Sequence, residues 1–226
     1  MRIDGAKPAV AGLAAALVLI PFCLLLVVAR APADGLDARA AAELHAYALA
    51  HPGVTRLLIV WTNVFGPWPW RVAVVAYAVW LFRRGATRPA VWAVTTMAVG
   101  GLLGAALKLV VARARPLLPD PVALAEGHAF PSGHALNVTL GAGVILLLTL
   151  PALSRRGRKA AWAAACFLVL SVGYTRIALG VHWVSDVVAG ISLGLAMIAA
   201  TLAGLARWPR DRRPVEPRPA RKVGTR

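Results

Sequence analysis

The stretch from Gly173 to Gly190 reads GYTRIALGVHWVSDVVAG and leads into a strongly apolar segment near the end of the chain. It carries one arginine, one histidine and one aspartate, namely Arg176, His182 and Asp186. Because His182 and Asp186 are four positions apart, on a helix they would lie on one face, where the carboxylate can hold one imidazole nitrogen and fix the tautomer of the other. This pattern is typical of a histidine oriented for nucleophilic attack or proton transfer.

The composition around this stretch indicates an integral membrane protein. Hydrophobic residues make up 59% of the 226 positions, charged residues only 15%, and the mean hydropathy is +0.70. These values lie far from those of a soluble domain. The formal net charge is +16, yet the basic residues are concentrated between and after apolar segments. Such a distribution is expected of cytoplasmic loops that hold a membrane protein in its orientation, so it argues against a nucleic-acid partner.

Apolar runs predict an all-α fold, an integral bundle of six transmembrane helices. The first run has about the 20 residues that a membrane-spanning helix needs. Residues 1–206 would form one domain, followed by a basic, disordered cytoplasmic tail at 207–226. The predicted spans are about Ala9–Ala29, Trp70–Phe82, Ala90–Val111, Ser132–Leu150, a fifth that ends near Tyr174, and Val181–Leu205.

The segment between the first two spans is less apolar. Arg30–Arg56 is mixed and polar, which predicts a short amphipathic helix on the membrane surface, with His45 and His51 as solvated side chains. The following apolar region, Leu57–Phe82, is broken by the sequence GPWP at 66–69. A short dipping segment is therefore expected before the second span.

The basic loops predict an orientation. With six spans, the N-terminus, the loops Arg83–Arg88 and Arg155–Lys159, and the basic tail share one side, which the positive-inside rule makes cytoplasmic. Both termini are then cytoplasmic. Positive charge on the opposite, external side runs against that rule and indicates a specific task. The basic residues expected there are Lys108, Arg113, Arg115 and Arg176.

Three stretches converge on this external side. KLVVARARP places Lys108 and Arg115 seven positions apart, about two helical turns and on one face. FPSGH at 130–134 suits a helix start, with a glycine that lets the backbone approach a ligand and a histidine in the first turn. Together with Arg176 and the N–H groups of a helix start, these residues predict a site for a multiply charged oxyanion such as phosphate.

Two histidines in such a site can divide the chemistry. A histidine oriented by a carboxylate can attack phosphorus, while the other can protonate the leaving oxygen. Since the phosphoryl transition state spreads negative charge over its equatorial oxygens, a clamp of lysine and arginine is the expected stabiliser.

A metal-dependent phosphatase is the chemical competitor, and it would need a cluster of carboxylates or histidines. Of the nine acidic residues, only Asp120, Glu126 and Asp186 fall near the predicted site. Three scattered acids amid strong positive charge favour a mechanism without a metal or another cofactor. Cys23 and Cys166 lie within apolar runs and are interpreted as small buried hydrophobes without a role.

The three stretches resemble the signature of the type 2 phosphatidic acid phosphatase superfamily, which is K-x6-R-P, then P-S-G-H, then S-R-x5-H-x3-D. Here they read Lys108–Pro116, Pro131–His134 and Thr175–Asp186, in the same order and spacing, with Thr175 where the family usually has serine. The resemblance covers residues 108–190 closely. It implies a bundle of six transmembrane helices that removes phosphate from lipid phosphates or pyrophosphates without a metal.

The resemblance also implies a role for each matched residue. His182 would be the nucleophile that forms a phosphohistidine, Asp186 its orienting partner, and His134 the general acid. His128 lies outside the signature and is interpreted as a loop residue. The residues that would bind the phosphoryl group are Lys108, Arg115, Ser132, Gly133 and Arg176.

The sequence thus predicts hydrolysis of a lipid phosphate at the outer face of a cytoplasmic membrane. The substrate would be of the undecaprenyl pyrophosphate, phosphatidylglycerol phosphate or phosphatidate type, and the motifs do not distinguish between these lipids or set an oligomeric state. Two alternatives remain at this point. One is a lipid phosphotransferase of the same fold, and the other is a non-catalytic membrane protein that binds or transports an anionic lipid.

Overall fold

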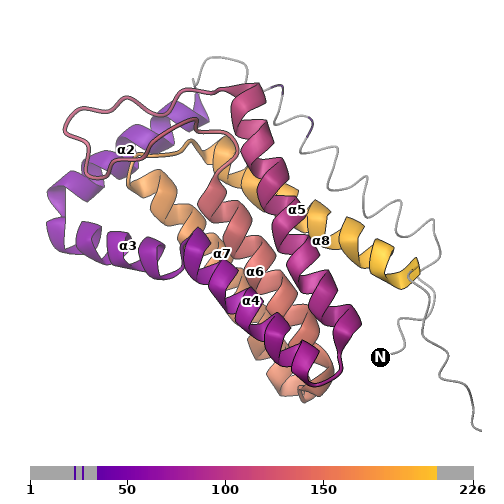
Figure 1. The fold of residues 1–226 in the computed structure, drawn as a ribbon. Helices are drawn as coiled ribbons and strands as arrows, with labels where there is room; N and C mark the ends of the chain where they lie inside the picture. Colours follow the sequence, from indigo (N-terminus) through magenta and orange to yellow (C-terminus); the bar gives the residue numbers. More distant parts are fainter. Residues whose placement is uncertain (1–22, 24–26, 28–34, 208–226) are drawn as a thin grey trace, which may run out of the picture.

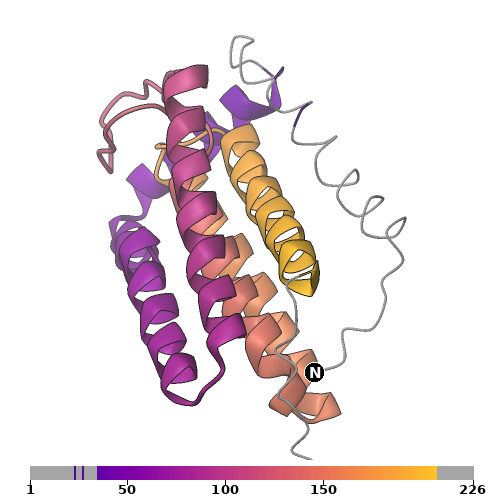
Figure 2. The same cartoon turned by 45° about the vertical axis from the view of Figure 1, so that its right-hand side comes forward.

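Helices make up all the regular secondary structure in the described part of the chain. The computed structural model describes residues 23, 27 and 35–207. Helices α4 to α8 run alongside one another, whereas α2 and α3 lie across one end of this bundle (Figures 1 and 2). The helices are α2 (Leu36–Ala50), α3 (Pro52–Val64), α4 (Pro67–Arg83), α5 (Thr87–Val111), α6 (Gly133–Thr149), α7 (Arg155–Ala178) and α8 (Val184–Arg207), with a 3-10 turn at Leu150–Ala152.

Helix α6 forms the centre of the bundle, because it packs against α4, α5, α7 and α8. Its sequence, GHALNVTLGAGVILLLT, is apolar around the whole circumference, as a helix covered on all sides requires. Two glycines let neighbouring helices come close. A Cβ atom at Gly141 would overlap the ring of Trp70 on α4, and one at Gly190 on α8 would lie 2.6 Å from the carbonyl oxygen of Ser132. Small residues therefore set the distances at which α4 and α8 meet α6.

Among the described residues, four helices are long and apolar enough to cross a membrane: α5, α6 with its 3-10 turn, α7 and α8. The prediction of a multi-pass, all-helical membrane protein is confirmed for the described residues. Helix α4, the predicted second span, has 17 residues. The predicted span at Ala9–Ala29 and the tail after Arg207 lie outside the described residues, so the count of six spans stays a prediction.

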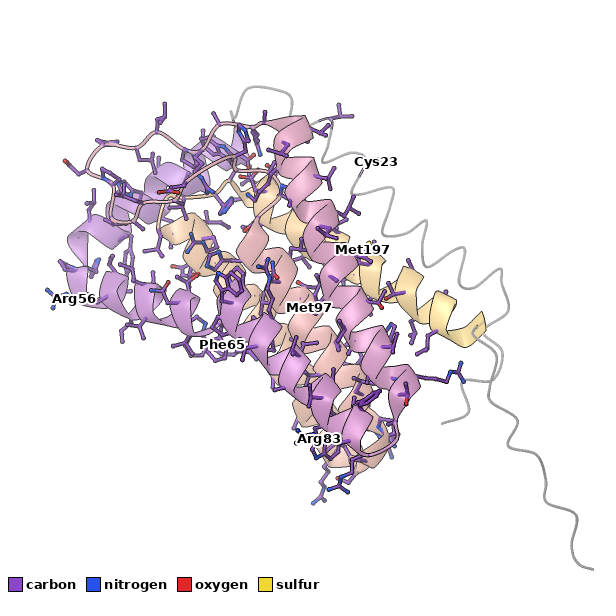
Figure 3. All side chains as sticks on the ribbon, in the orientation of Figure 1. Cys23, Arg56, Phe65, Arg83, Met97 and Met197 are labelled. Carbon is purple, nitrogen blue, oxygen red and sulfur yellow. The ribbon has the colours of Figure 1, made fainter. Side chains whose placement is uncertain are left out.

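Different segments of the chain form the two ends of the bundle. The α4–α5 turn carries Arg83, Arg84 and Arg88, and the α6–α7 connection is followed by the run Arg155–Lys159. Figure 3 shows Arg83 at the end of the bundle opposite to α2. The loop 112–132, α2 and the α7–α8 turn occupy the other end (Figure 1).

Several predictions for the segment before α4 need correction. In place of one short amphipathic helix, the described residues from 35 onward form α2 and α3, which meet at His51 before Pro52. The prediction of a solvated His45 is wrong, because its side chain is buried and its Nε2 atom lies 2.7 Å from the carbonyl oxygen of Pro119. His51 is exposed, and the predicted break at 66–69 is confirmed by the corner between α3 and α4.

The prediction that Cys23 and Cys166 are buried is also wrong. Both are exposed on the surface of the described structure. Cys166 lies on α7 next to Phe167, whose side chain is 60% exposed. In a membrane protein the outward faces of the helices are as apolar as the core, since they meet lipid. An apolar run therefore predicts a span, but not which of its residues are buried.

Candidate active site

A cavity of about 510 Å³ opens where α3, α5, α6, α7 and the loop 112–132 meet. It lies at the end of the bundle that carries α2 and α3, where many nitrogen atoms gather in Figure 3. Its walls bring together nearly all of the predicted site residues. Those that line it are Lys108, Arg115, Gly133, His134, Arg176 and His182, joined by Thr62 and Asn63 of α3. Ser132 directly precedes Gly133, and Asp186 follows His182 by four residues. Both are fully buried.

His182 and Asp186 meet as predicted, although not on one helix. His182 lies in the turn before α8, and Asp186 lies in the first turn of α8. The Nδ1 atom of His182 is 3.5 Å from Oδ2 of Asp186, a distance at the long limit of a hydrogen bond. The same Oδ2 atom accepts a hydrogen bond of 3.0 Å from the backbone N–H of Trp183. The Asp186 carboxylate thus accepts a backbone hydrogen bond at the start of α8 and also faces the His182 imidazole.

The environment of His182 favours a neutral imidazole. Burial lowers its pKa to about 4, against the opposing hydrogen bond and charge of Asp186. Nη1 of Arg115 lies 3.2 Å from the Nε2 atom of the ring. Because a guanidinium can only donate, Nε2 acts as the acceptor, and the ring proton then sits on Nδ1, toward Asp186. The lone pair of Nε2 is thereby left on the side of the cavity.

Arg115 reaches the cavity from a loop, which corrects the prediction that it shares a helix face with Lys108. Helix α5 ends at Val111, and Ala112 takes a left-handed backbone conformation with φ of 48°, which turns the chain back. The guanidinium donates to the carbonyl oxygens of Gly127 at 2.9 Å, Val181 at 2.6 Å and Glu126 at 2.8 Å. Burial lowers the pKa of Arg115, which remains a cation at neutral pH.

Lys108 reaches the same cavity from the last turn of α5. Its Nζ atom donates to the backbone carbonyl of His128 at 2.6 Å. A Cβ atom at Gly133 would lie 3.9 Å from the Cε atom of Lys108, so the lysine stem passes over the start of α6. The Lys108 ammonium and the Arg115 guanidinium therefore converge from two different segments.

Besides Nδ1 of His182, which faces Asp186 at 3.5 Å, two buried polar groups of the predicted site have no hydrogen-bond partner among the described residues. Ser132 is the N-cap residue of α6, yet its hydroxyl makes no capping bond. Arg176 donates from Nη1 to Oγ1 of Thr62 at 3.1 Å, while its Nε atom has no partner. Since buried polar atoms are almost always paired, these are the groups that a polar ligand would satisfy.

A buried ion pair behind His182 was missed by sequence reasoning. Arg113 donates from Nη1 to Oδ1 of Asp186 at 2.7 Å and from Nη2 to Oδ2 of Asp37 on α2 at 2.9 Å. Ser185 joins the two sides, because its hydroxyl bonds Asp37 and its backbone N–H donates to Oδ1 of Asp37 at 2.9 Å. The ring of Trp183 packs 5.6 Å from the guanidinium carbon of Arg113. Helix α2 thus fixes the carboxylate that faces His182.

Arg113 is the residue of the sequence from which this ion pair could have been predicted. It is an arginine on the external side that the three motifs do not use, and a buried arginine needs a carboxylate partner. Asp37 was interpreted as part of a surface helix, but it is only 8% exposed. The other two acids considered near the site, Asp120 and Glu126, are exposed, and Glu126 lies at the cavity wall.

Comparison with known proteins places this geometry in a family. Residues 89–210, more than half of the chain, match the model of the PAP2 superfamily. The chain belongs to the PAP2 superfamily. Two curated PAP2 relatives are an undecaprenyl-diphosphatase of Sulfolobus acidocaldarius, 39% identical over 106 residues, and phosphatidylglycerophosphatase B of Bacillus subtilis, 38% identical over 99 residues. The matches cover 45% and 42% of this chain and 48% of each relative, so the chain aligns with about half the length of either.

A solved PAP2 structure shares the fold over most of the chain. It is described as the first transmembrane PAP2 type phosphatidylglycerolphosphate phosphatase from Bacillus subtilis, and it superposes with a TM-score of 0.75 at 24% sequence identity. The superposition covers 88% of this chain and 98% of the other. This confirms the PAP2 membrane fold over a larger share of the chain than the family model matches.

Proposed function

We propose that this PAP2 protein hydrolyses a lipid phosphate or lipid pyrophosphate through a phosphohistidine intermediate. The observation that carries the proposal is a buried, neutral His182 whose Nε2 faces a cavity lined by the cations Lys108, Arg115 and Arg176. The undecaprenyl-diphosphatase and the phosphatidylglycerophosphatase among the relatives act on phosphorylated lipids, which supports the same substrate class here.

The reaction would begin with attack on phosphorus. The phosphoryl oxygens are bound by the three cations, the Ser132 hydroxyl and the backbone at Gly133, where the start of α6 favours an anion. The Nε2 lone pair of His182 forms the P–N bond while the bond from phosphorus to the leaving oxygen breaks, and His134, as the general acid, gives a proton to that oxygen. The charge that develops on the imidazole is stabilised by Asp186. Water then attacks the phosphohistidine, with His134 as the base, and releases phosphate.

We propose that the reaction is independent of metal ions, because the side chains around the cavity are poorly suited to coordinate one. The two buried carboxylates nearest the cavity, Asp37 and Asp186, are both bonded to Arg113. Within the residues that the structure describes, no three His, Cys, Asp or Glu side chains gather to hold an ion. The three cations supply the charge stabilisation that a metal ion would otherwise provide.

The orientation belongs to the same proposal. Six spans over residues 1–206, a cytoplasmic tail at 207–226 and cytoplasmic termini would put the basic turns Arg83–Arg88 and Arg155–Lys159 inside. The cavity, at the other end of the bundle, would then face the exterior of a cytoplasmic membrane.

Phosphate release tests the activity directly. Purified protein in detergent with a metal chelator should release inorganic phosphate from a lipid phosphate without an added acceptor. A lipid-binding or transport protein would bind the same lipid and release none. A phosphotransferase would release phosphate only slowly, and an added acceptor alcohol would take up the phosphoryl group instead.

The pH dependence tests the state of His182. Because burial lowers its pKa to about 4, the nucleophile stays neutral from neutral pH down to about pH 4 and is protonated, hence inactive, below it. We expect the acid limb of kcat/KM to be centred near 4 rather than at the usual histidine value of about 6.5. Substrates with different phosphate pKa values separate this limb from titration of the substrate. If the acid limb of kcat/KM were centred near pH 6.5 for every substrate, the nucleophile would not be a buried, neutral histidine.

A further inference from the structure

Arg71 is a cation in the transmembrane part of the bundle that the proposed reaction does not use. It lies in the second turn of α4 and is partly buried. Its Nε atom donates to Oδ1 of Asn137 on α6 at 3.2 Å, and its guanidinium carbon lies 5.2 Å from the centre of the Trp68 ring. Among the described residues no carboxylate pairs with it. An ionisable residue at such a position is a candidate for function.

The neighbours of Arg71 fix its depth relative to the cavity. Asn137 follows His134 by about one turn on α6, and its amide donates to the carbonyl oxygen of Gly133 at 2.8 Å. On α5, a Cβ atom at Gly101 would lie 4.0 Å from Nη2 of Arg71, and Gly101 is seven residues before Lys108. Arg71 therefore lies between α4, α5 and α6, about one to two helical turns deeper in the membrane than the catalytic residues.

Arg71 is on the side where the leaving group would depart. Nε2 of His134 is 3.6 Å from the position of a Cβ at Gly66, the residue at the corner from which α4 starts. Helix α4 runs from that corner into the bundle and carries Arg71 about one turn further on. A lipid whose terminal phosphate sits against His182 and whose leaving oxygen sits at His134 would have Arg71 on the α4 side of its path into the bundle.

We propose that Arg71 binds a second phosphate group of the substrate, on the membrane side of the phosphate that is removed. This rests on the proposed function and names its substrate class. Asn137 holds Nε, which leaves the edge formed by the two terminal nitrogens to bind phosphate oxygens in a bidentate manner. In a lipid pyrophosphate the leaving group is itself a phosphate, so the guanidinium neutralises the charge that remains when the P–O bond breaks. In phosphatidylglycerol phosphate the second phosphate is the diester one glycerol further along, whereas phosphatidate has none.

The competing explanation is a structural one, in which Arg71 only ties α4 to α6 through Asn137. The two explanations differ in their dependence on substrate. Loss of a structural tie would affect all lipids alike, whereas loss of a phosphate contact would affect only lipids with a second phosphate.

The experiment compares kcat/KM for undecaprenyl pyrophosphate, phosphatidylglycerol phosphate and phosphatidate in detergent micelles. Arg71→Gln should lower kcat/KM by about 10- to 100-fold for the lipids with a second phosphate that the wild type accepts, the usual range for a lost charged hydrogen bond, and by less than about threefold for phosphatidate. Arg71→Lys, which keeps the charge without the fork, should lie between. If kcat/KM falls more for one of the two lipids that carry a second phosphate, the subsite fits the spacing between the phosphates of that lipid.

Arg84→Gln is the matched control, because Arg84 stacks over Trp80 at 5.1 Å at the opposite end of the same helix. It should leave all three activities unchanged. Three outcomes would each overturn the subsite. Arg71→Gln could lower kcat/KM equally for all three lipids, or for none of them. The wild type could also accept phosphatidate alone.

A binding measurement separates this proposal from the proposed function. If the wild type released phosphate from none of the lipids, the hydrolase assignment would fail while the subsite could still be correct. Arg71→Gln should then bind the lipids with a second phosphate at least about tenfold more weakly than the wild type and bind phosphatidate equally. Equal affinity of both proteins for all three lipids would overturn the subsite as well.

Discussion

Replacement of His182 by alanine is expected to lower phosphate release by about 10⁴-fold or more, because the substitution removes the atom that forms the covalent bond to phosphorus. The measurement is kcat with a saturating lipid phosphate, together with trapping of a 32P-labelled, acid-labile phosphoenzyme after rapid quenching. The wild type should show the labelled protein and the variant should not.

His51→Ala is the control for this substitution, because His51 is exposed at the junction of α2 and α3 and makes only local contacts with Tyr47. It should retain wild-type activity. Both variants should elute as the wild type does in size-exclusion chromatography. Turnover by a folded His182→Ala protein at more than a few per cent of the wild-type rate would exclude His182 as the nucleophile.

Replacement of Arg113 by methionine is expected to destabilise the protein by about 3–5 kcal/mol, the usual result of removing one partner from a buried ion pair. The substitution leaves the carboxylates of Asp37 and Asp186 buried without their shared cation. It also frees Oδ1 of Asp186, so the carboxylate that faces His182 loses its fixed orientation. We expect a lower Tm in detergent and a kcat at least about tenfold lower, measured at a temperature where the variant is folded.

A double-mutant cycle distinguishes this account from a simple packing defect. Asp37→Asn removes one of the two stranded charges, so the double variant Arg113→Met/Asp37→Asn should be more stable than the sum of the two single losses predicts. The coupling should be about 1 kcal/mol or more. Additive losses would mean that the ion pair is not what holds α2 against α8.

The local geometry within each motif could be predicted in part, because it depends on residues close together in sequence. Ser132 and Gly133 begin α6 as a Pro-Ser-Gly sequence predicts, and His182 and Asp186 face each other across one turn. The prediction that Arg115 extends the helix face of Lys108 was wrong because α5 ends at Val111 and the next residue, Ala112, has a left-handed conformation. Nothing in the residue type at Ala112 signals that stop.

The supporting part of the site could not be predicted because it depends on contacts between distant segments. Asp37 is 76 residues from Arg113, and His45 is 74 residues from Pro119, whose carbonyl it contacts. In the sequence both side chains belong to a polar stretch that resembles a surface helix. Loop 112–132 and the start of α8 bury them together, and no spacing rule within α2 encodes those contacts.

The ion pair between α2 and the residues behind His182 also bears on how PAP2 proteins can be recombined. The region matched by the family model begins at residue 89, yet Asp37 and Thr62, which bond Arg113 and Arg176, both come before it. A hybrid enzyme that takes only the matched region from this chain would separate two arginines from their native partners. The module to exchange is therefore longer than the matched region, and it should begin before Leu36, at the start of α2.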